Sequence, residues 1–167
     1  MTKLEIYELL RRENIPHEVT EHEPLFSMDA QRDGMLPHPE ALAKNLFVRD
    51  KKKRCIALIT VRGDKRVNLN AFSSSHGLKR LSFAMPDMLD AMLHVKPGSV
   101  TPLALLSEDA AGVDFYLDKD FMGGLIGIHP CDNTATVWMQ TDDLLRLLAD
   151  AGHPAILTEL KEATQSA

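Results

Sequence analysis

The feature that most restricts the fold of this chain is an apolar stretch at residues 55–61 (CIALITV), broken only by one threonine. A run of this kind suits a β-strand that is buried on both faces. Residues 45–49 (NLFVR) also predict a strand, and the polar residues 50–53 between the two segments predict a turn. The sequence therefore predicts a hairpin that carries lysines at its tip.

Amphipathic patterns predict several helices around this hairpin. Thr2 and Glu5 have the spacing of a capping box, and Asn14 is expected to end the helix that they begin. Further helices are predicted at 69–75, from Pro86 to the Pro97-Gly98 pair, and, with Thr141 as its cap, from 141 to 152. Residues 27–39 are predicted to form a short helix followed by an irregular loop.

Short apolar segments predict further strands at 17–22, 113–117, 125–128, 135–138 and 155–157. In the second of these, apolar and polar residues alternate as they do in a half-buried strand. The strands and helices do not follow a strict βαβ alternation. The pattern therefore predicts an α+β fold with one curled, barrel-like mixed sheet flanked by helices.

The length of 167 residues suits one domain with a single core, and we expect residues 1–167 to form it. No apolar run approaches the roughly 20 residues that span a bilayer. The N-terminus lacks the apolar core of a signal peptide. Cys55 and Cys131 form no CxxC pair. We therefore expect a reduced, cytoplasmic protein with no membrane partner.

Charge is unevenly distributed along the chain. The net charge is −5, but residues 44–80 contain 11 basic and 2 acidic residues, which makes this segment +9 and the remainder −14. A positive face on an acidic body can attract a polyanion. The alternative, in which these charges only solvate turns, stays open.

Familiar catalytic motifs are missing from the sequence: GxGxxG, GxxxxGK[ST], HExxH and GxSxG do not occur. His129 and Cys131 lack further ligands at metal-binding spacing, so no metal site is predicted. Nothing near Cys131 in sequence is clearly arranged to lower the pKa of its thiol, which argues against a thiolate nucleophile. No cofactor is predicted either.

Four other features stand out along the chain. Lys44 precedes the strand at 45–49, and residues 98–102 (GSVTP) follow a helix end. His129-Pro130 ends one predicted strand, and residues 133–138 (NTATVW) begin the next. Taken singly, each has a structural explanation, because a lysine before a strand is usually solvated and a Gly-to-Pro pentapeptide is usually a turn.

Taken together and in this order, these features resemble the YbaK/ProX family of aminoacyl-tRNA deacylases. This family is related to the editing domain inserted in bacterial-type prolyl-tRNA synthetases. The resemblance is greatest to its freestanding alanyl-tRNA(Pro) editing members. It rests on six segments: 22–24 (HEP), 44–50 (KNLFVRD), 80–84 (RLSFA), 98–102 (GSVTP), 129–130 (HP) and 133–138 (NTATVW).

The resemblance implies roles for several residues. Lys44 would hold the 3′ terminal adenosine of the tRNA or its phosphate, and His129 would help to shape the pocket. Gly98 and Pro102 match the family's GxxxP loop, whose backbone would surround the scissile ester. The other substrate-binding candidates are Ser99, Val100 and Thr101 in this loop, Asn133 and Thr134 beside His129, and Phe47, which has core packing as its alternative.

The resemblance implies trans-editing of a mischarged tRNA, with hydrolysis of alanyl-tRNA(Pro) to alanine and free tRNA. The implied partner is the 3′ end of an aminoacylated tRNA, and prolyl-tRNA synthetase is a further candidate. Three alternatives stay open at this point. The substrate could be cysteinyl- or seryl-tRNA, the protein could be a catalytically silent tRNA- or nucleic-acid-binding module, or it could be a structural partner of another enzyme.

Overall fold

The predicted hairpin is the centre of the structure. In the computed structural model, which describes residues 1–24 and 36–160, strands β2 (Ala43–Asp50) and β3 (Ile56–Arg62) pair in antiparallel fashion. The five central residues of β3 are buried, as the apolar run predicts. Lys44 lies within β2, opposite Val61, and not before the strand as expected.

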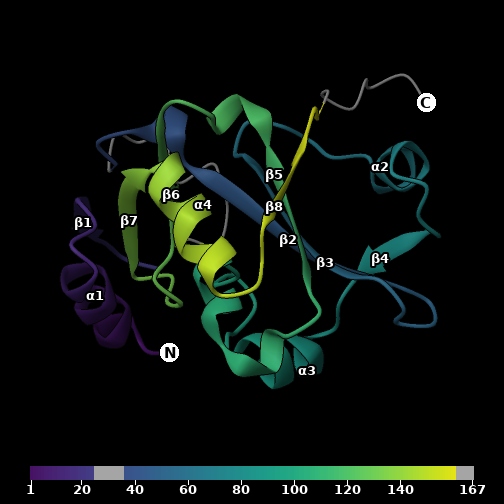
Figure 1. Ribbon diagram of the computed structural model, residues 1–167, viewed down its shortest axis with the longest axis horizontal. Coiled ribbons are helices and arrows are strands. Elements are labelled where there is room, and N and C mark those ends of the chain that lie inside the picture. The colour runs from purple at the N-terminus through teal and green to yellow at the C-terminus, as the bar shows by residue number, and fades with distance from the viewer. Residues whose placement is uncertain (25–35, 161–167) are drawn as a thin grey trace.

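The hairpin belongs to a five-stranded mixed sheet in the order β4-β2-β3-β5-β8 (Figure 1). The short strand β4 (Leu81–Phe83), which was not predicted, pairs antiparallel with β2 at one edge. On the other side, β5 (Asp114–Asp118) and β8 (Ala155–Thr158) add in parallel. The expectation that β5 is half-buried is wrong: four of its five residues are buried, because the strand lies in the interior of the sheet.

A second, three-stranded antiparallel sheet has the order β1-β7-β6. It consists of β1 (His17–Glu21), β7 (Ala135–Gln140) and β6 (Leu125–Ile128). A single parallel bridge between Leu42 and Gly127 connects the two sheets. The α+β class is confirmed, but the sheet does not close into one barrel. Pro130 helps to explain this, since it has no N–H with which to extend the bridge beyond His129.

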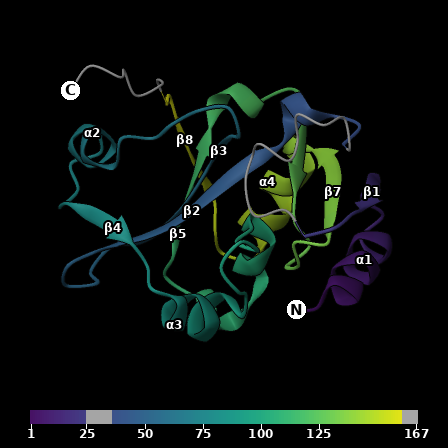
Figure 2. The same ribbon diagram turned by 180° about the vertical axis from the view of Figure 1, so that it is seen from behind.

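Helices cover the sheets at both ends of the molecule (Figures 1 and 2). The α-helices are α1 (Lys3–Arg12), α2 (Leu69–Ser75), α3 (Pro86–Met88) and α4 (Thr141–Asp150). Helix α3 continues into a π-helical turn, η3 (Leu89–Leu93). The 3-10 turns are η2 (Pro39–Ala41), η4 (Pro102–Leu106), η5 (Glu108–Ala110) and η6 (Lys119–Phe121).

Two predicted helix boundaries differ from the structure. The N-cap of α4 is Gln140 and not Thr141, whose buried hydroxyl has no hydrogen-bond partner among the described residues. The helix that begins at Pro86 ends at Leu93, because His94 adopts a left-handed conformation with φ of 54°. The helix and loop expected at 27–39 lie largely outside the described residues.

Three apolar clusters form the core. The largest packs α1 and α4 against the strands and includes Ile6, Phe47, Phe115 and Leu148. The second lies between the five-stranded sheet and α2, and the third contains Leu42 and Trp138. Among residues 1–24 and 36–160, no helix has the length and apolar character that a bilayer crossing requires.

Candidate active site

Lys44 and His129 both lie close in sequence to the joint between the two sheets. Leu42 and Gly127 form the parallel bridge, and Lys44 and His129 each follow two residues later on neighbouring chain segments. Side chains two residues apart in a strand point to the same side. Two residues that are 85 positions apart in sequence therefore follow the same bridge on neighbouring segments, and we call this part of the surface the joint face.

Lys44 is half-buried on this face, and its ammonium donates a hydrogen bond to the carbonyl of Lys65. Burial lowers the pKa of Lys44, and the nearby Arg66 guanidinium lowers it further, while Asp64 opposes the change. The side chain is thus a desolvated cation that is held at a defined place, and it is suited to binding an anionic group.

The carbonyl that receives Lys44 is itself fixed by a buried ion pair. The Lys65 ammonium lies 2.7 Å from Asp118 Oδ2 and 2.7 Å from Asp120 Oδ2. Burial opposes the charge of Lys65, but hydrogen bonds to Asp118 and Asp120 raise its pKa overall. Asp118 is fully buried and also accepts hydrogen bonds from the backbone N–H groups of Arg62 and Asp120. The loop that holds Lys44 is therefore anchored to the end of β5.

His129 is held as a neutral imidazole with a defined tautomer. Its Nδ1 is 2.8 Å from the carbonyl oxygen of Ala135, so Nδ1 carries the proton and Nε2 is an acceptor. Burial lowers the pKa of His129, against the opposing effect of the Ala135 hydrogen bond. His22 lies beside it with the two ring centroids 6.2 Å apart, and its charge would lower the pKa further.

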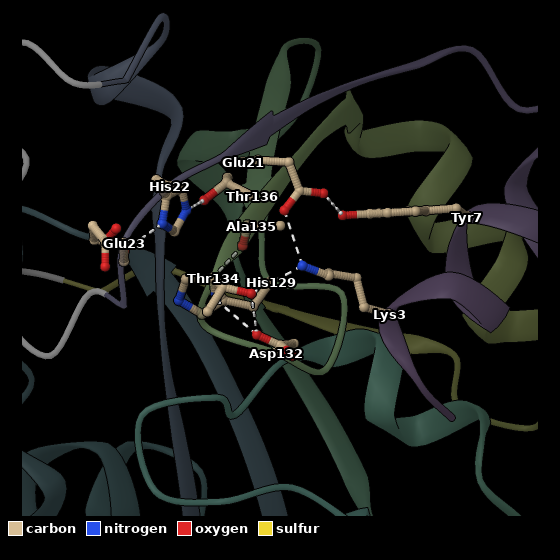
Figure 3. A network of polar contacts seen from close by, with 10 residues as sticks. All are labelled: Lys3, Tyr7, Glu21, His22, Glu23, His129, Asp132, Thr134, Ala135 and Thr136. Atoms are coloured by element: carbon tan, nitrogen blue, oxygen red, sulfur yellow. Dashed lines mark hydrogen bonds and ion pairs between the residues drawn. The ribbon is translucent and has the colours of Figure 1, made fainter.

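A polar network holds the loop that follows His129 (Figure 3). Asp132 accepts hydrogen bonds from the backbone N–H and the hydroxyl of Thr134. Lys3 of α1 donates to Thr134 Oγ1 at 3.0 Å and to Glu21 at 2.9 Å. Glu21 also accepts a hydrogen bond from the hydroxyl of Tyr7. Helix α1 therefore ties β1 to the loop that carries His129, and Asn133 lies half-buried in the same loop.

His22 is fixed on both sides of its ring. Its Nδ1 donates to the carbonyl of Glu23, and its Nε2 accepts from the hydroxyl of Thr136, each at 2.8 Å. The neutral imidazole can form both hydrogen bonds. Together they occupy both ring nitrogens, so neither nitrogen is free for chemistry. The role of His22 is therefore to pack beside the ring of His129.

Gly127 lies beneath the joint face because a side chain does not fit there. A Cβ at this position would lie 2.3 Å from the indole ring of Trp138. Trp138 is fully buried, donates to Thr20 Oγ1 at 3.0 Å, and meets the His38 ring edge-on at 5.2 Å between centroids. The indole thus packs directly against the β6 backbone at Gly127.

The predicted 98–102 loop forms a tight entry into η4. Gly98 has φ of 91°, a left-handed conformation that favours glycine. Thr101 is buried and caps η4, and the buried Pro102 begins it. The N–H of Ser99 donates to the Lys96 carbonyl at 3.0 Å, so it is already used. Within the described residues, the N–H groups of Gly98, Val100 and Thr101 have no such partner.

Phe47 occupies a different environment from Lys44. It is only 3% exposed and packs in the largest core cluster, on the opposite side of β2 from Lys44. Val100 of the 98–102 loop packs against the same cluster. The position favours the core-packing alternative for Phe47.

The structure places ten of the eleven basic residues of segment 44–80 in two groups, and the half-buried Arg49 of β2 belongs to neither. Lys44, Arg62, Lys65 and Arg66 gather near the joint, where Arg62 pairs with Asp64 at 3.3 Å. Six exposed cations form a second group at the other end of the hairpin, which we call the basic end. Its members are Lys51, Lys52, Lys53, Arg54, Lys79 and Arg80. Lys79 and Arg80 lie there because Leu81 pairs with Asp50, next to the hairpin tip.

Sequence reasoning missed His22, Lys65, Asp118 and the Lys3 network as parts of the site. His22 lies in one of the family-like segments, which is the only signal that pointed to it. Asp118 and Lys65 are 53 residues apart and carry no motif, so only the pairing of β3 with β5 brings them together.

The chemistry available at the joint face is that of a cation beside a neutral imidazole acceptor. Burial raises the pKa of Cys131 to about 11, so its thiol stays protonated and is a poor nucleophile. The arrangement suits binding and hydrolysis of an already activated ester more than attack by a side-chain nucleophile.

The sequence profile of a family described as aminoacyl-tRNA editing domain matches residues 22–147. The prolyl-tRNA editing protein ProX of Acetoanaerobium sticklandii is 30% identical over 147 residues, covering 87% of this chain and 90% of that protein. Prolyl-tRNA synthetase associated domain-containing protein 1 of Danio rerio is 36% identical over 162 residues, covering 92% and 85% respectively.

A solved structure of a proposed trans-editing enzyme for prolyl tRNA synthetase has the same fold. It matches with a TM-score of 0.68 at 20% identity, over 98% of this chain and 99% of that one. A second solved structure, hypothetical protein APE2540, matches with a TM-score of 0.69 at 18% identity, over 96% of this chain and 100% of that one. At these identities the likeness concerns the fold.

Proposed function

Because this chain belongs to the family of aminoacyl-tRNA editing domains, and is thus an aminoacyl-tRNA deacylase, we propose that it edits proline tRNA in trans. The substrate that we propose is alanyl-tRNA(Pro), hydrolysed to alanine and free tRNA. The observation that carries the proposal is the bridge between the two sheets, since Lys44 and the neutral His129 each follow it by two residues. Two relatives whose names refer to prolyl-tRNA support the choice of tRNA.

In this mechanism Lys44 anchors the 3′ end of the tRNA. The Lys44 ammonium is half-buried and hydrogen-bonded to the Lys65 carbonyl. Its side chain therefore loses little further conformational entropy when it binds a phosphate or a ribose oxygen. Lys44 remains protonated during the reaction and takes no part in bond-making. Its role is to fix the ester relative to His129.

His129 orients the aminoacyl group. Its Nε2 is an acceptor because Nδ1 donates to Ala135, and a neutral acceptor suits the α-ammonium of an aminoacyl ester. A hydrogen bond to a charged donor contributes about 1.5–3 kcal/mol, which is enough to select one orientation of the substrate. Thr134 and Asn133 support this arrangement by keeping the loop in place.

Backbone N–H groups of the 98–102 loop stabilise the tetrahedral oxyanion in this proposal. Gly98, Val100 and Thr101 supply the candidate donors, since the N–H of Ser99 is already used. One such donor is typically worth about 3 kcal/mol of barrier. The attacking group is water, aided by the vicinal ribose hydroxyl, because the ester needs no stronger nucleophile.

Alanine is selected by size. A pocket excludes a larger side chain sterically but cannot easily reject a smaller one, so an editing site for alanine must be too small for proline. Cysteine and serine are close to alanine in size, so cysteinyl- and seryl-tRNA are the alternative substrates.

Hydrolysis of alanyl-, prolyl-, cysteinyl- and seryl-tRNA by the wild type and by Lys44→Ala tests the proposal. We expect fast loss of alanine alone and a drop of at least 100-fold in kcat/KM for Lys44→Ala. Arg12→Ala removes an exposed cation from the end of α1 and serves as the control. Preferred release of cysteine or serine would replace alanine as the substrate, and full activity of Lys44→Ala would reject the anchor.

Prolyl-tRNA synthetase stays a candidate partner in this proposal. An editing enzyme that meets its substrate as the synthetase releases it would bind the synthetase weakly and transiently. Sedimentation of the two proteins with and without charged tRNA would measure this association.

A further inference from the structure

An aromatic side chain lies exposed on the edge strand β4. Phe83 is 58% exposed, although Leu81 in the same strand is buried in the core. Met85, just beyond the strand, is 62% exposed. Single exposed apolar side chains are ordinary on protein surfaces, so this exposure needs a second observation before it indicates a ligand.

The second observation is the charge around Phe83. The basic end, with its six exposed cations, surrounds the start of β4 and the tip of the β2–β3 hairpin. None of the six forms a salt bridge with a residue of the described ranges 1–24 and 36–160. The nearby Asp50 is buried and accepts a hydrogen bond from the N–H of Cys55 within the turn. An exposed ring beside unpaired cations is the combination that binds single-stranded nucleic acid.

The third observation is the position of Phe83 relative to Lys44. Phe83 pairs directly with Val48, so the two side chains point to the same side of the sheet. Lys44 lies four residues before Val48 on the same strand and on the same side. At about 3.3 Å per residue, Lys44 and Phe83 are separated by about 13 Å along β2.

This separation matches a short stretch of nucleic acid strand. At about 3.4 Å per stacked nucleotide, 13 Å corresponds to about four nucleotides, and to fewer where the strand is extended. A strand whose 3′ terminal ester lies at Lys44 would therefore pass Phe83 with one of its last single-stranded bases. Figures 1 and 2 show β4 and the hairpin tip at the opposite end of the molecule from α1 and β1.

We propose that Phe83 is a stacking platform for a base near the single-stranded 3′ end of the tRNA, and that the basic end holds the phosphates of the adjoining stem. The inference rests on the proposed function, because it takes the position of the ester from Lys44. A second copy of this chain pairing along the β4 edge, or a protein partner, is the competing occupant of this surface.

Two substitutions at Phe83 and one control at another position separate stacking from packing. Phe83→Leu keeps an apolar side chain but removes the aromatic ring, Phe83→Trp keeps a ring, and Leu157→Ala on the opposite edge strand β8 is the matched control. With aminoacyl-tRNA we expect Phe83→Leu to raise KM about tenfold, because stacking on one base is worth about 1–3 kcal/mol. Phe83→Trp and Leu157→Ala should stay within twofold of the wild type.

Aminoacyl-adenosine, which has no upstream bases, is the companion substrate. All four proteins should cleave it with the same kcat/KM if Phe83 acts only on upstream bases. An equal loss by Phe83→Leu on both substrates would reject the inference, since it would place the effect in the site itself. Equal KM values for Phe83→Leu and wild type with aminoacyl-tRNA would also reject it.

A binding measurement keeps the inference independent of hydrolysis. Uncharged tRNA with 2-aminopurine placed in turn at each single-stranded 3′ position reports stacking by its quenched fluorescence. We expect one position to be quenched by the wild type and by Phe83→Trp, but not by Phe83→Leu. Quenching with no hydrolysis would reject the proposed function and keep this inference, whereas a Phe83-dependent dimer in sedimentation without quenching would reject the inference.

Discussion

At the scale of single residues, burial moves the pKa values of His129 and Lys44 in the same direction with different consequences. A lowered pKa makes His129 neutral over a wider pH range, so its Nε2 stays available as an acceptor. A lowered pKa brings Lys44 closer to losing its charge, yet a lysine starts from about 10.4 and still binds anions near neutral pH. The joint face thus keeps a cation beside a neutral ring.

These directions predict a bell-shaped dependence of kcat/KM on pH. Activity should be lost on the acid side as the pH falls through the pKa of His129, which lies below the ordinary histidine value of about 6.5. It should be lost on the alkaline side as the pH rises through the pKa of Lys44, which lies below the ordinary lysine value of about 10.4. His129→Asn should remove the acid limb, and Lys44→Arg should move the alkaline limb upward. The rates are measured after subtraction of uncatalysed hydrolysis, and an unchanged acid limb in His129→Asn would contradict the assignment.

The lowered pKa of His129 also makes the stability of the fold depend on pH. The unfolded chain binds the proton at about pH 6.5, whereas the folded chain binds it only at a lower pH. The contribution of the neutral His129 to the free energy of unfolding is therefore fully present above about pH 6.5. It is lost as the pH falls through the pKa that His129 has in the folded chain.

Asp118 is the residue whose removal should cost the most stability at the site. In Asp118→Asn, the buried carboxylate that pairs with Lys65 is gone, and the free energy of unfolding should fall by about 3 kcal/mol in urea titration. Activity should fall as well, since the Lys65 carbonyl that holds Lys44 loses its anchor. Asp120→Asn is the control, because Asp120 is exposed and pairs with the same Lys65. Its effect should be much smaller, because solvent screens an exposed pair, and equal losses in the two variants would contradict this account.

At the scale of elements, local patterns located most helices and strands, while contacts between distant segments decided their burial and grouping. The run at 55–61 and the helix at 69–75 were predicted well because their signals are local. The burial of β5 was not predicted, since it depends on the pairing of β3 and β8 with its two edges. Within residues 1–24 and 36–160, the two sheets are connected by one isolated bridge between Leu42 and Gly127. No local pattern encodes such a contact.

The same distinction between local patterns and distant contacts applies to the candidate site. Lys44, Gly98 and His129 were found through family-like segments, and their roles stay proposals. Helix α1 was predicted from its cap and periodicity, but not its contact with the His129 loop. That contact joins residues 131 positions apart, and it depends on β1 pairing with β7.

Lys3→Met tests whether α1 positions the His129 loop. The change keeps the length of the side chain but removes its bonds to Thr134 and Glu21. We expect kcat/KM to fall several-fold, while the free energy of unfolding changes by about 1 kcal/mol or less, as for a surface pair. Arg11→Met breaks the exposed pair with Glu8 on the same helix and should leave both quantities unchanged. Equal activities of the two variants would show that α1 does not act on the loop.

Gly127→Ala tests the packing beneath the joint. The new methyl group would overlap the indole of Trp138, so the free energy of unfolding should fall by about 1–3 kcal/mol. Gly124→Ala, where the nearest atom is 3.9 Å away, should be nearly neutral in the same thermal and urea measurements. Wild-type stability of Gly127→Ala would mean that Trp138 moves freely, and the joint would then not be a fixed surface.

At the scale of the whole molecule, charge and site are separated along one strand. Lys44 lies near the start of β2, and the basic end begins where β2 turns into β3. The chain outside residues 44–80 carries −14, so it repels RNA while the hairpin attracts it. Under the proposed function, a tRNA that approaches this molecule would therefore be oriented before its ester reaches the joint face.

This orientation predicts a particular dependence on salt. Each phosphate that a lysine neutralises contributes about −0.7 to −0.9 to the slope of log affinity against log salt concentration. Replacing Lys51, Lys52 and Lys53 together by alanine should make the slope for tRNA binding shallower by about 2–3, while kcat at saturating substrate stays the same. Arg11→Ala/Arg12→Ala, which removes two exposed cations from α1 at the other end of the molecule, should leave the slope unchanged. If both variants changed the slope equally, attraction would depend on net charge alone, and the path along β2 from the basic end to Lys44 would lose its electrostatic support.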